Sequence, residues 1–149
     1  MKDTLPALAK AAIAARDLAY APYSGFKVGA ALLTADGKIY TGCNIENAAL
    51  TPGNCAERTA FFKAVSEGAR DFAAIAVAGW AAGEGETPGH VYPCGVCRQV
   101  MAEFCRPDFL IASAVSEDDF EVHTLAELFP HGFGPGSLGN GKGDGGSSP

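Results

Sequence analysis

The sequence predicts an α/β protein in which a mixed five-stranded sheet lies between two layers of helices, a three-layer α/β/α sandwich. Throughout residues 3–129, segments with apolar residues at helical spacing alternate with short apolar runs that end at turn residues. The last two runs are separated only by residues 116–119, too few for the crossover that joins parallel strands. The last strand is therefore expected to run antiparallel to the strand before it.

The first predicted elements are a helix and a hairpin. Between Asp3 and Tyr20, apolar residues recur at helical intervals and predict a helix with one buried face. Residues 26–33 and 39–43 have the composition of strands, and Asp36-Gly37 between them is a strong turn signal. These two segments should pair as an antiparallel hairpin.

The middle of the chain should contain two helices and a buried strand. Residues 54–68 predict a helix that begins at a capping Asn54 and ends near a glycine. The apolar run over residues 72–80 predicts a buried strand, which leads into a loop rich in Gly, Glu and Pro. Pro93 then precedes a third helix, over residues 94–105.

Two further strands, residues 109–115 and 120–123, and a short helix over residues 124–129 complete a single predicted domain, residues 1–133. Residues 134–149 are rich in Gly, Ser and Pro and have almost nothing to bury. We expect this segment to be a flexible C-terminal tail.

The composition favours a small, diffusible substrate. No apolar stretch reaches the ~20 residues that span a bilayer, and residues 1–3 do not begin a secretion signal, so a cytoplasmic location is expected. The formal net charge of −6 argues against broad contact with a nucleic-acid backbone, which needs clustered Lys and Arg. The five cysteines, an odd number, indicate reduced thiols and not a disulfide framework.

Three cysteines have the spacing of metal ligands. Cys94 and Cys97 lie one helical turn apart, so both can face one ion, although this pair alone also suits a redox dithiol or two unrelated buried thiols. Cys55 lies at the start of the preceding helix, where backbone N–H groups and the helix dipole favour a thiolate. Three ligands leave the fourth tetrahedral position of Zn²⁺ open to water, as in catalytic sites. Cys43 and Cys105 are expected to be ordinary buried cysteines.

Glu57 is the candidate proton carrier. A glutamate in the first turn of a helix often only complements the helix dipole. Two residues after Cys55, however, it can reach a zinc-activated water without being a ligand. The histidines His90, His123 and His131 are not needed as ligands and should lie at the surface or at strand ends.

Several linked motifs occur in order between Leu18 and Phe133: Tyr23-Ser24-Gly25-Phe26-Lys27-Val28-Gly29-Ala30, Gly42-Cys43-Asn44-Ile45-Glu46-Asn47, Cys55-Ala56-Glu57-Arg58 and Pro93-Cys94-Gly95-Val96-Cys97-Arg98-Gln99. Together they resemble the small zinc-dependent cytidine deaminases that use three cysteines. The resemblance implies the deaminase sandwich, one zinc ion per subunit, no organic cofactor and a homotetramer. It implies a hydrolase of pyrimidine salvage that converts cytidine and deoxycytidine to uridine and deoxyuridine with release of ammonia.

The resemblance also implies roles for individual residues. Glu57 would carry protons to ring atom N3 and to the leaving amino group, and Arg58 would donate a hydrogen bond to a ligand sulfur. Asn44 and Glu46 would bind ribose hydroxyls. The plainer alternatives are that Arg58 lies at the surface, that Asn44 caps a loop and that Glu46 is exposed to solvent.

Further implied contacts involve the base and a neighbouring subunit. Phe26 would pack near the pyrimidine, unless it is an ordinary core residue, and the Ala56 N–H and the Tyr92 carbonyl would bind the base O2 and amino group. Phe133 would reach a neighbouring site in a tetramer, unless it packs within its own tail. The chain departs from the family at two places. Tyr92 replaces a small hydroxyl residue, which would change the shape of the pocket rim, and the usual acidic residues are missing after Phe133.

Three alternatives remain open. One is a related deaminase of another cytosine nucleoside, such as blasticidin S. Another is a deaminase that edits nucleic acid, which the net acidity and the short link between the last strands oppose. The third is a non-catalytic zinc-binding module whose thiols stabilise the fold.

Overall fold

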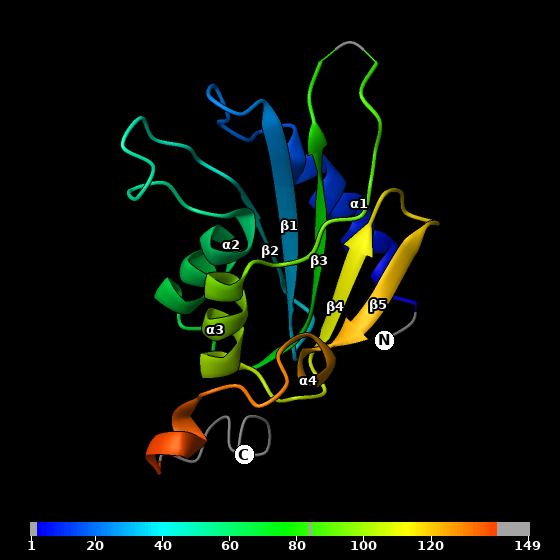
Figure 1. The fold of residues 1–149 in the computed structure, drawn as a ribbon. Coiled ribbons are helices and arrows are strands. Elements are labelled where there is room, and N and C mark those ends of the chain that lie inside the picture. Colours follow the sequence, from blue (N-terminus) through cyan, green and yellow to red (C-terminus); the bar gives the residue numbers. More distant parts are fainter. Residues whose placement is uncertain (1–2, 84, 140–149) are drawn as a thin grey trace.

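A mixed sheet of five strands, in the order β2-β1-β3-β4-β5, forms the centre of the computed structural model, which describes residues 3–83 and 85–139 (Figure 1). β3 and β4 are parallel, and every other neighbouring pair is antiparallel. The predicted mixed sheet and antiparallel last strand are therefore confirmed. The strands are β1 (Phe26–Thr34), β2 (Ile39–Cys43), β3 (Phe72–Ala81), β4 (Leu110–Ala114) and β5 (Phe120–Thr124).

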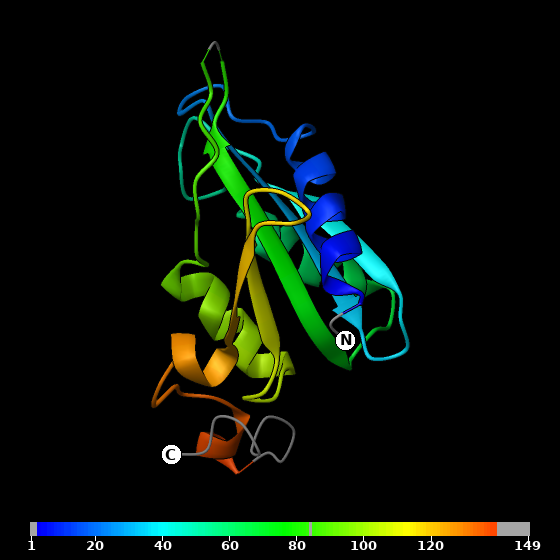
Figure 2. The same ribbon diagram turned by 90° about the vertical axis from the view of Figure 1, so that its right-hand side faces the viewer.

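Helices cover both faces of the sheet, as the sequence predicts. α1 (Leu5–Arg16) packs on one face, and α2 (Ala56–Ser66) and α3 (Gly95–Phe104) pack on the other (Figures 1 and 2). A one-turn α4 (Leu125–Leu128), held by a capping box at Thr124, follows β5. None of the helices within residues 3–83 and 85–139 is long and apolar enough to cross a membrane.

The alternation of side chains along the strands builds two cores. Ala30 and Leu32 of β1 face α2 and α3, whereas Ala31 and Leu33 face α1. Both faces of the strand are buried, so its sequence is a continuous apolar run and not an alternating one.

Two glycines let helices lie directly on the strands. A Cβ on Gly29 of β1 would lie 2.0 Å from the Ala12 carbonyl oxygen in α1. A Cβ on Gly42 of β2 would lie 2.5 Å from the Ala56 carbonyl oxygen in the first turn of α2. The second of these contacts sets the height above the sheet of the helix that carries Cys55 and Glu57.

Two helix boundaries differ from the prediction. α1 ends at Arg16 because the backbone of Tyr20 bonds instead to the segment after β2, with its N–H donating to the Asn44 carbonyl. Asn54 is not the cap of α2, so that prediction is wrong: its backbone pairs with Ile45 and its side chain donates to Thr59. Cys55 takes the N-cap position.

The predicted flexible tail lies mostly outside the described residues. Of residues 134–149, the structure describes 134–139, where Pro135–Leu138 form one 3₁₀ turn. Gln99 of α3 donates a hydrogen bond to the Phe133 carbonyl at 2.8 Å, which fixes the chain just before that turn.

Candidate active site

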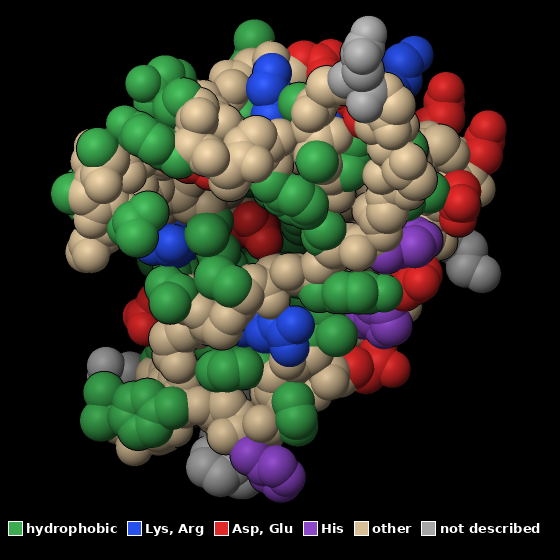
Figure 3. Space-filling view, turned by 45° about the horizontal axis from the view of Figure 1, so that its top comes forward, with side chains coloured by type: hydrophobic (Ala, Val, Ile, Leu, Met, Phe, Trp, Pro, Cys, Tyr) green, Lys and Arg blue, Asp and Glu red, His purple; other side chains and the backbone are tan. Residues whose placement is uncertain are grey.

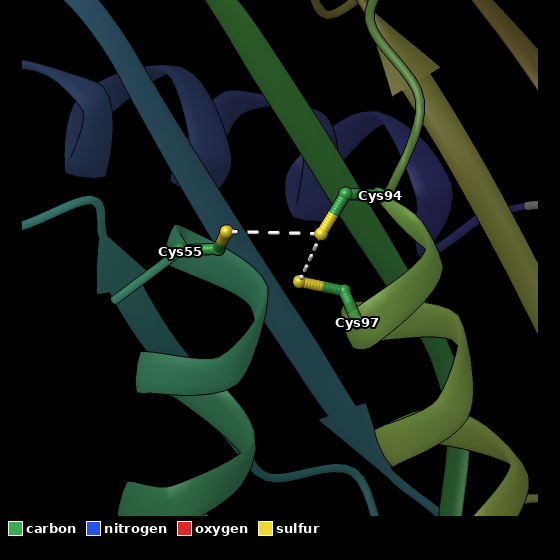
Figure 4. A group of neighbouring side chains, drawn as sticks. All are labelled: Cys55, Cys94 and Cys97. Carbon is green, nitrogen blue, oxygen red and sulfur yellow. Dashed lines mark hydrogen bonds between the residues drawn. The ribbon is translucent and has the colours of Figure 1, made fainter. Parts of the chain in front are cut away.

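Three sulfur atoms face one another between the starts of α2 and α3 (Figure 4). Cys94 Sγ lies 3.9 Å from Cys55 Sγ and 3.5 Å from Cys97 Sγ. Tetrahedral zinc with Zn–S bonds of about 2.3 Å places its sulfur ligands roughly 3.8 Å apart. The three thiols therefore fit a zinc ion without rearrangement of the backbone.

The local sequence explains why the thiols converge. Cys55 and Cys94 both occupy N-cap positions with extended backbone, so each side chain projects from the N-terminal end of its helix. Cys97 is in the first turn of α3, on the same side as Cys94, and is 1% exposed. At both helix ends the dipole favours negative charge, as thiolate ligands require.

The described residues contribute no fourth His, Cys, Asp or Glu to this group. Cys43 is half-buried at the end of β2, and Cys105 is buried in the core beneath α2 and α3. A three-thiolate set leaves one zinc position for water, which is typical of catalytic centres.

Arg58 adds positive charge beside the thiols. Its Nη2 donates to Cys55 Sγ at 3.2 Å, the contact that the resemblance implies. Hydrogen bonds from Cys97 and then from Arg58 lower the pKa of Cys55 to about 5. The pKa of Cys97 is raised by its hydrogen bond to Cys55 and by burial. Before metal binds, Cys55 therefore ionises more readily than Cys97, and a divalent cation would favour ionisation of Cys97 as well.

Glu57 is buried, with 5% of its surface exposed, and lines the same cavity as Cys55 and Cys94. Burial, followed by the negative charge of Cys55, raises its pKa to about 7. A carboxyl group with that pKa can both accept and release a proton near neutral pH. Glu57 therefore has the properties required of a proton carrier.

The cavity has a volume of about 680 Å³ and its lining is largely apolar. Figure 3 shows a hollow bordered mainly by hydrophobic side chains, with an acidic side chain inside it. All the predicted site residues except the buried Cys97 line this cavity: Phe26, Asn44, Glu46, Cys55, Ala56, Glu57, Arg58, Tyr92 and Cys94.

Asn44 and Glu46 already make hydrogen bonds that shape the cavity wall. Asn44 accepts from the Val28 N–H at 2.8 Å and donates to the Phe26 carbonyl at 2.9 Å. Glu46 accepts from the backbone N–H groups of Tyr23 and Ser24 and from the Ser24 hydroxyl. Each side chain keeps at least one further bonding position for a ligand, since an amide and a carboxylate can make about four hydrogen bonds each.

The structure also brings in residues to which the sequence analysis gave no role. Val28 and Val91 line the cavity, although both resemble core positions in the sequence. Ser24 accepts a hydrogen bond from the Phe26 N–H as well as donating to Glu46. The Tyr23-Ser24-Gly25-Phe26 motif is the feature of the sequence that could have indicated a role for Ser24. Phe26 itself is 40% exposed at the cavity, so it is not an ordinary core residue.

Comparisons with known sequences agree with this geometry. Residues 2–113 match the family described as "Cytidine and deoxycytidylate deaminase zinc-binding region". The chain is 55% identical over 119 residues to the cytidine deaminase of Sporosarcina psychrophila, a match that covers 80% of this chain and 83% of that protein. It is 52% identical over 126 residues to the cytidine deaminase of Halalkalibacterium halodurans, a match that covers 85% of this chain and 91% of that protein.

Comparisons with solved structures support the same conclusion. The crystal structure of cytidine deaminase from Burkholderia pseudomallei aligns with a TM-score of 0.76 at 51% identity, covering 85% of this chain and 97% of that one. The crystal structure of cytidine deaminase from Mycobacterium tuberculosis aligns with a TM-score of 0.71 at 35% identity, covering 89% of this chain and 97% of that one. With the sheet order, the thiol triangle and these matches in agreement, the chain belongs to the zinc-binding cytidine and deoxycytidylate deaminase family.

Proposed function

We propose that the protein hydrolyses cytidine and deoxycytidine to uridine and deoxyuridine with release of ammonia. One observation carries the proposal: the buried Glu57 carboxyl lines a nucleoside-sized cavity beside three thiols that fit a zinc ion. A purely structural zinc site would not need a buried acid next to it, because burying a carboxyl group costs stability.

Cys55, Cys94 and Cys97 hold the metal in this proposal. When bound, zinc supplies a Lewis acid that makes a water molecule nucleophilic near neutral pH. Glu57 accepts one proton from the attacking water and delivers it to N3 of the cytosine ring. The second proton of that water passes through the same carboxylate to the amino group, which leaves as ammonia.

Side chains and backbone around the cavity bind the rest of the substrate. Asn44 and Glu46 bind the ribose hydroxyls through the bonding positions they retain. Phe26 packs against the pyrimidine. The Ala56 N–H and the Tyr92 carbonyl orient the base through its O2 and amino group.

The proposal extends to assembly and cellular role. We infer a homotetramer in which Phe133, 57% exposed here, reaches a neighbouring site. Exposed aromatic residues are common anchors at such interfaces. The reaction would serve pyrimidine salvage in the cytoplasm, without nucleic-acid or membrane partners.

Steady-state assays on purified protein with measured zinc content test the proposal. Cytidine, deoxycytidine, cytosine, blasticidin S and a cytosine-containing oligonucleotide form the substrate panel. We expect turnover of the two nucleosides alone. Turnover of blasticidin S without cytidine would indicate the related deaminase, and turnover of the oligonucleotide would indicate an editing enzyme. Zinc binding with no turnover of any substrate would support a structural module.

A further inference from the structure

One carboxylate beside the cavity meets three side chains. The Tyr92 hydroxyl donates to Glu121 Oε1 of β5 at 2.5 Å. His123 Nε2 lies 3.3 Å from the same oxygen, and His90 Nε2 lies 3.7 Å from Glu121 Oε2. Figure 3 shows histidine and acidic side chains together beside the hollow. Glu121 thus joins β5 to the segment of residues 90–92, which precedes the first cysteine of α3.

The same segment has a second attachment, to β4. His90 Nδ1 lies 3.1 Å from the Ser113 carbonyl oxygen and 3.2 Å from the Ser113 hydroxyl. The Tyr92 ring also packs edge-on against His123, with ring centroids 5.8 Å apart. His90 and Tyr92 therefore both point toward the β4–β5 edge of the sheet.

Val91, between them, points the other way. Val91 packs against the core and lines the cavity, and its Cγ2 lies 3.2 Å from where a Cβ on Gly79 would be. Tyr92 lines the cavity as well. Whatever fixes the outer side of this segment therefore fixes the cavity wall on its inner side.

The residues that follow are held separately. Arg98 Nε donates to the Pro93 carbonyl at 2.7 Å, and the Arg98 N–H donates to the Cys94 carbonyl at 3.0 Å. Release of residues 90–92 should therefore leave Cys94 in place and disturb the substrate wall alone.

We propose that Glu121 is a positioning residue for substrate binding: through Tyr92 and His90 it holds residues 90–92 so that Val91 and the Tyr92 backbone keep their places in the cavity. The inference rests on the proposed function for its substrate. It gives a reason for the tyrosine at position 92, whose phenolic hydroxyl reaches Glu121 on β5. Glu121 acts through these residues and is not itself among those lining the cavity.

Variants of both partners test the proposal in zinc-loaded protein. E121A and Y92F should each raise KM for cytidine roughly three- to tenfold, as expected for loss of one ordinary, solvent-exposed hydrogen bond, with kcat changed less than about twofold. E121Q keeps an oxygen acceptor and should restore KM to within about twofold of the parent value. The double variant should be no worse than E121A alone, because E121A already removes the partner of the Tyr92 hydroxyl. E117A, which removes an exposed carboxylate from the neighbouring turn, is the matched control.

The proposal is overturned by an unchanged KM in E121A, by additive effects in the double variant, or by loss of zinc from E121A, since Arg98 holds Cys94 independently. Hydrogen–deuterium exchange of residues 90–92 gives a readout that needs no turnover. It should be faster in E121A than in E117A, and equal rates would overturn the proposal. If the parent protein does not deaminate cytidine, the proposed function fails, and the exchange measurement still tests the role of Glu121.

Discussion

Arg58 Nη2 lies 3.2 Å from Cys55 Sγ and donates a hydrogen bond to it from the same turn of α2. Three thiolates would place a net negative charge on a zinc centre, which weakens its ability to activate water. A guanidinium bonded to one sulfur withdraws part of that charge and also favours the thiolate over the thiol. One side chain thus influences both metal loading and reactivity.

Replacement of Arg58 should shift zinc binding to higher pH. Arg58 helps to lower the pKa of Cys55 to about 5, so R58A raises that pKa, and protons then compete with the metal over a wider range. We expect the pH midpoint of zinc uptake to rise by about 0.5–1 unit. R106A removes the same charge from an exposed position and should leave the midpoint unchanged. Equal midpoints in the two variants would contradict this account.

Replacement of Glu57 should separate chemistry from metal binding. E57Q keeps the size and burial of the side chain but cannot carry a proton. The kcat for cytidine should fall by about 10²–10⁴-fold, the usual contribution of general acid–base catalysis. Zinc content should stay near that of the parent protein, because Glu57 is outside the thiol group. E103Q, on the exposed side of α3, is the matched control. Activity close to that of the parent would show that another group carries the protons.

Replacement of Ser24 should weaken binding of the sugar of the substrate and leave binding of the base unchanged. The Ser24 hydroxyl bonds to Glu46 Oε2 and accepts from the Phe26 N–H, so S24A releases one oxygen of the carboxylate proposed to bind ribose, while the other oxygen keeps its backbone donors. KM for cytidine should rise roughly threefold to tenfold, the effect of about 1 kcal/mol. The change should be smaller for 2′,3′-dideoxycytidine, which lacks those hydroxyls. S66A, at the exposed end of α2, is the control. An equal rise in KM for both substrates in S24A would contradict the proposed role of Glu46.

The order of elements and the zinc triangle could be predicted because each depends on local signals. Helical spacing placed Cys94 and Cys97 in one turn, and Cys55 at the start of the preceding helix supplied the third sulfur. The cap at Asn54 was wrong because the backbone of this residue pairs with Ile45, a contact set by the fold and not by neighbouring sequence. Local propensity yields to such pairing.

Contacts between distant segments could not be predicted in this way. Tyr92 and Glu121 are separated by 29 residues, and their hydrogen bond depends on how the segment before α3 crosses β4 to reach β5. Ser24 and Glu46 meet across 22 residues for a similar reason. Sequence patterns identify which residues carry chemistry, whereas the register of the sheet decides which residues hold them in place.

The two close glycines provide a final prediction, which separates stability from the site. A Cβ on Gly29 would collide with the backbone of α1, and a Cβ on Gly42 would collide with the backbone of α2 at Ala56. Both G29A and G42A should lower the free energy of unfolding by about 1–3 kcal/mol or more, because backbone cannot yield as a flexible side chain does. G42A alone should also weaken zinc binding, since it displaces the turn that carries Cys55. G89A, whose Cβ would meet nothing within 4 Å, is the control for both. Chelator competition and denaturant unfolding measure the two effects, and equal zinc affinity in G29A and G42A would show that the position of α2 does not control the metal site.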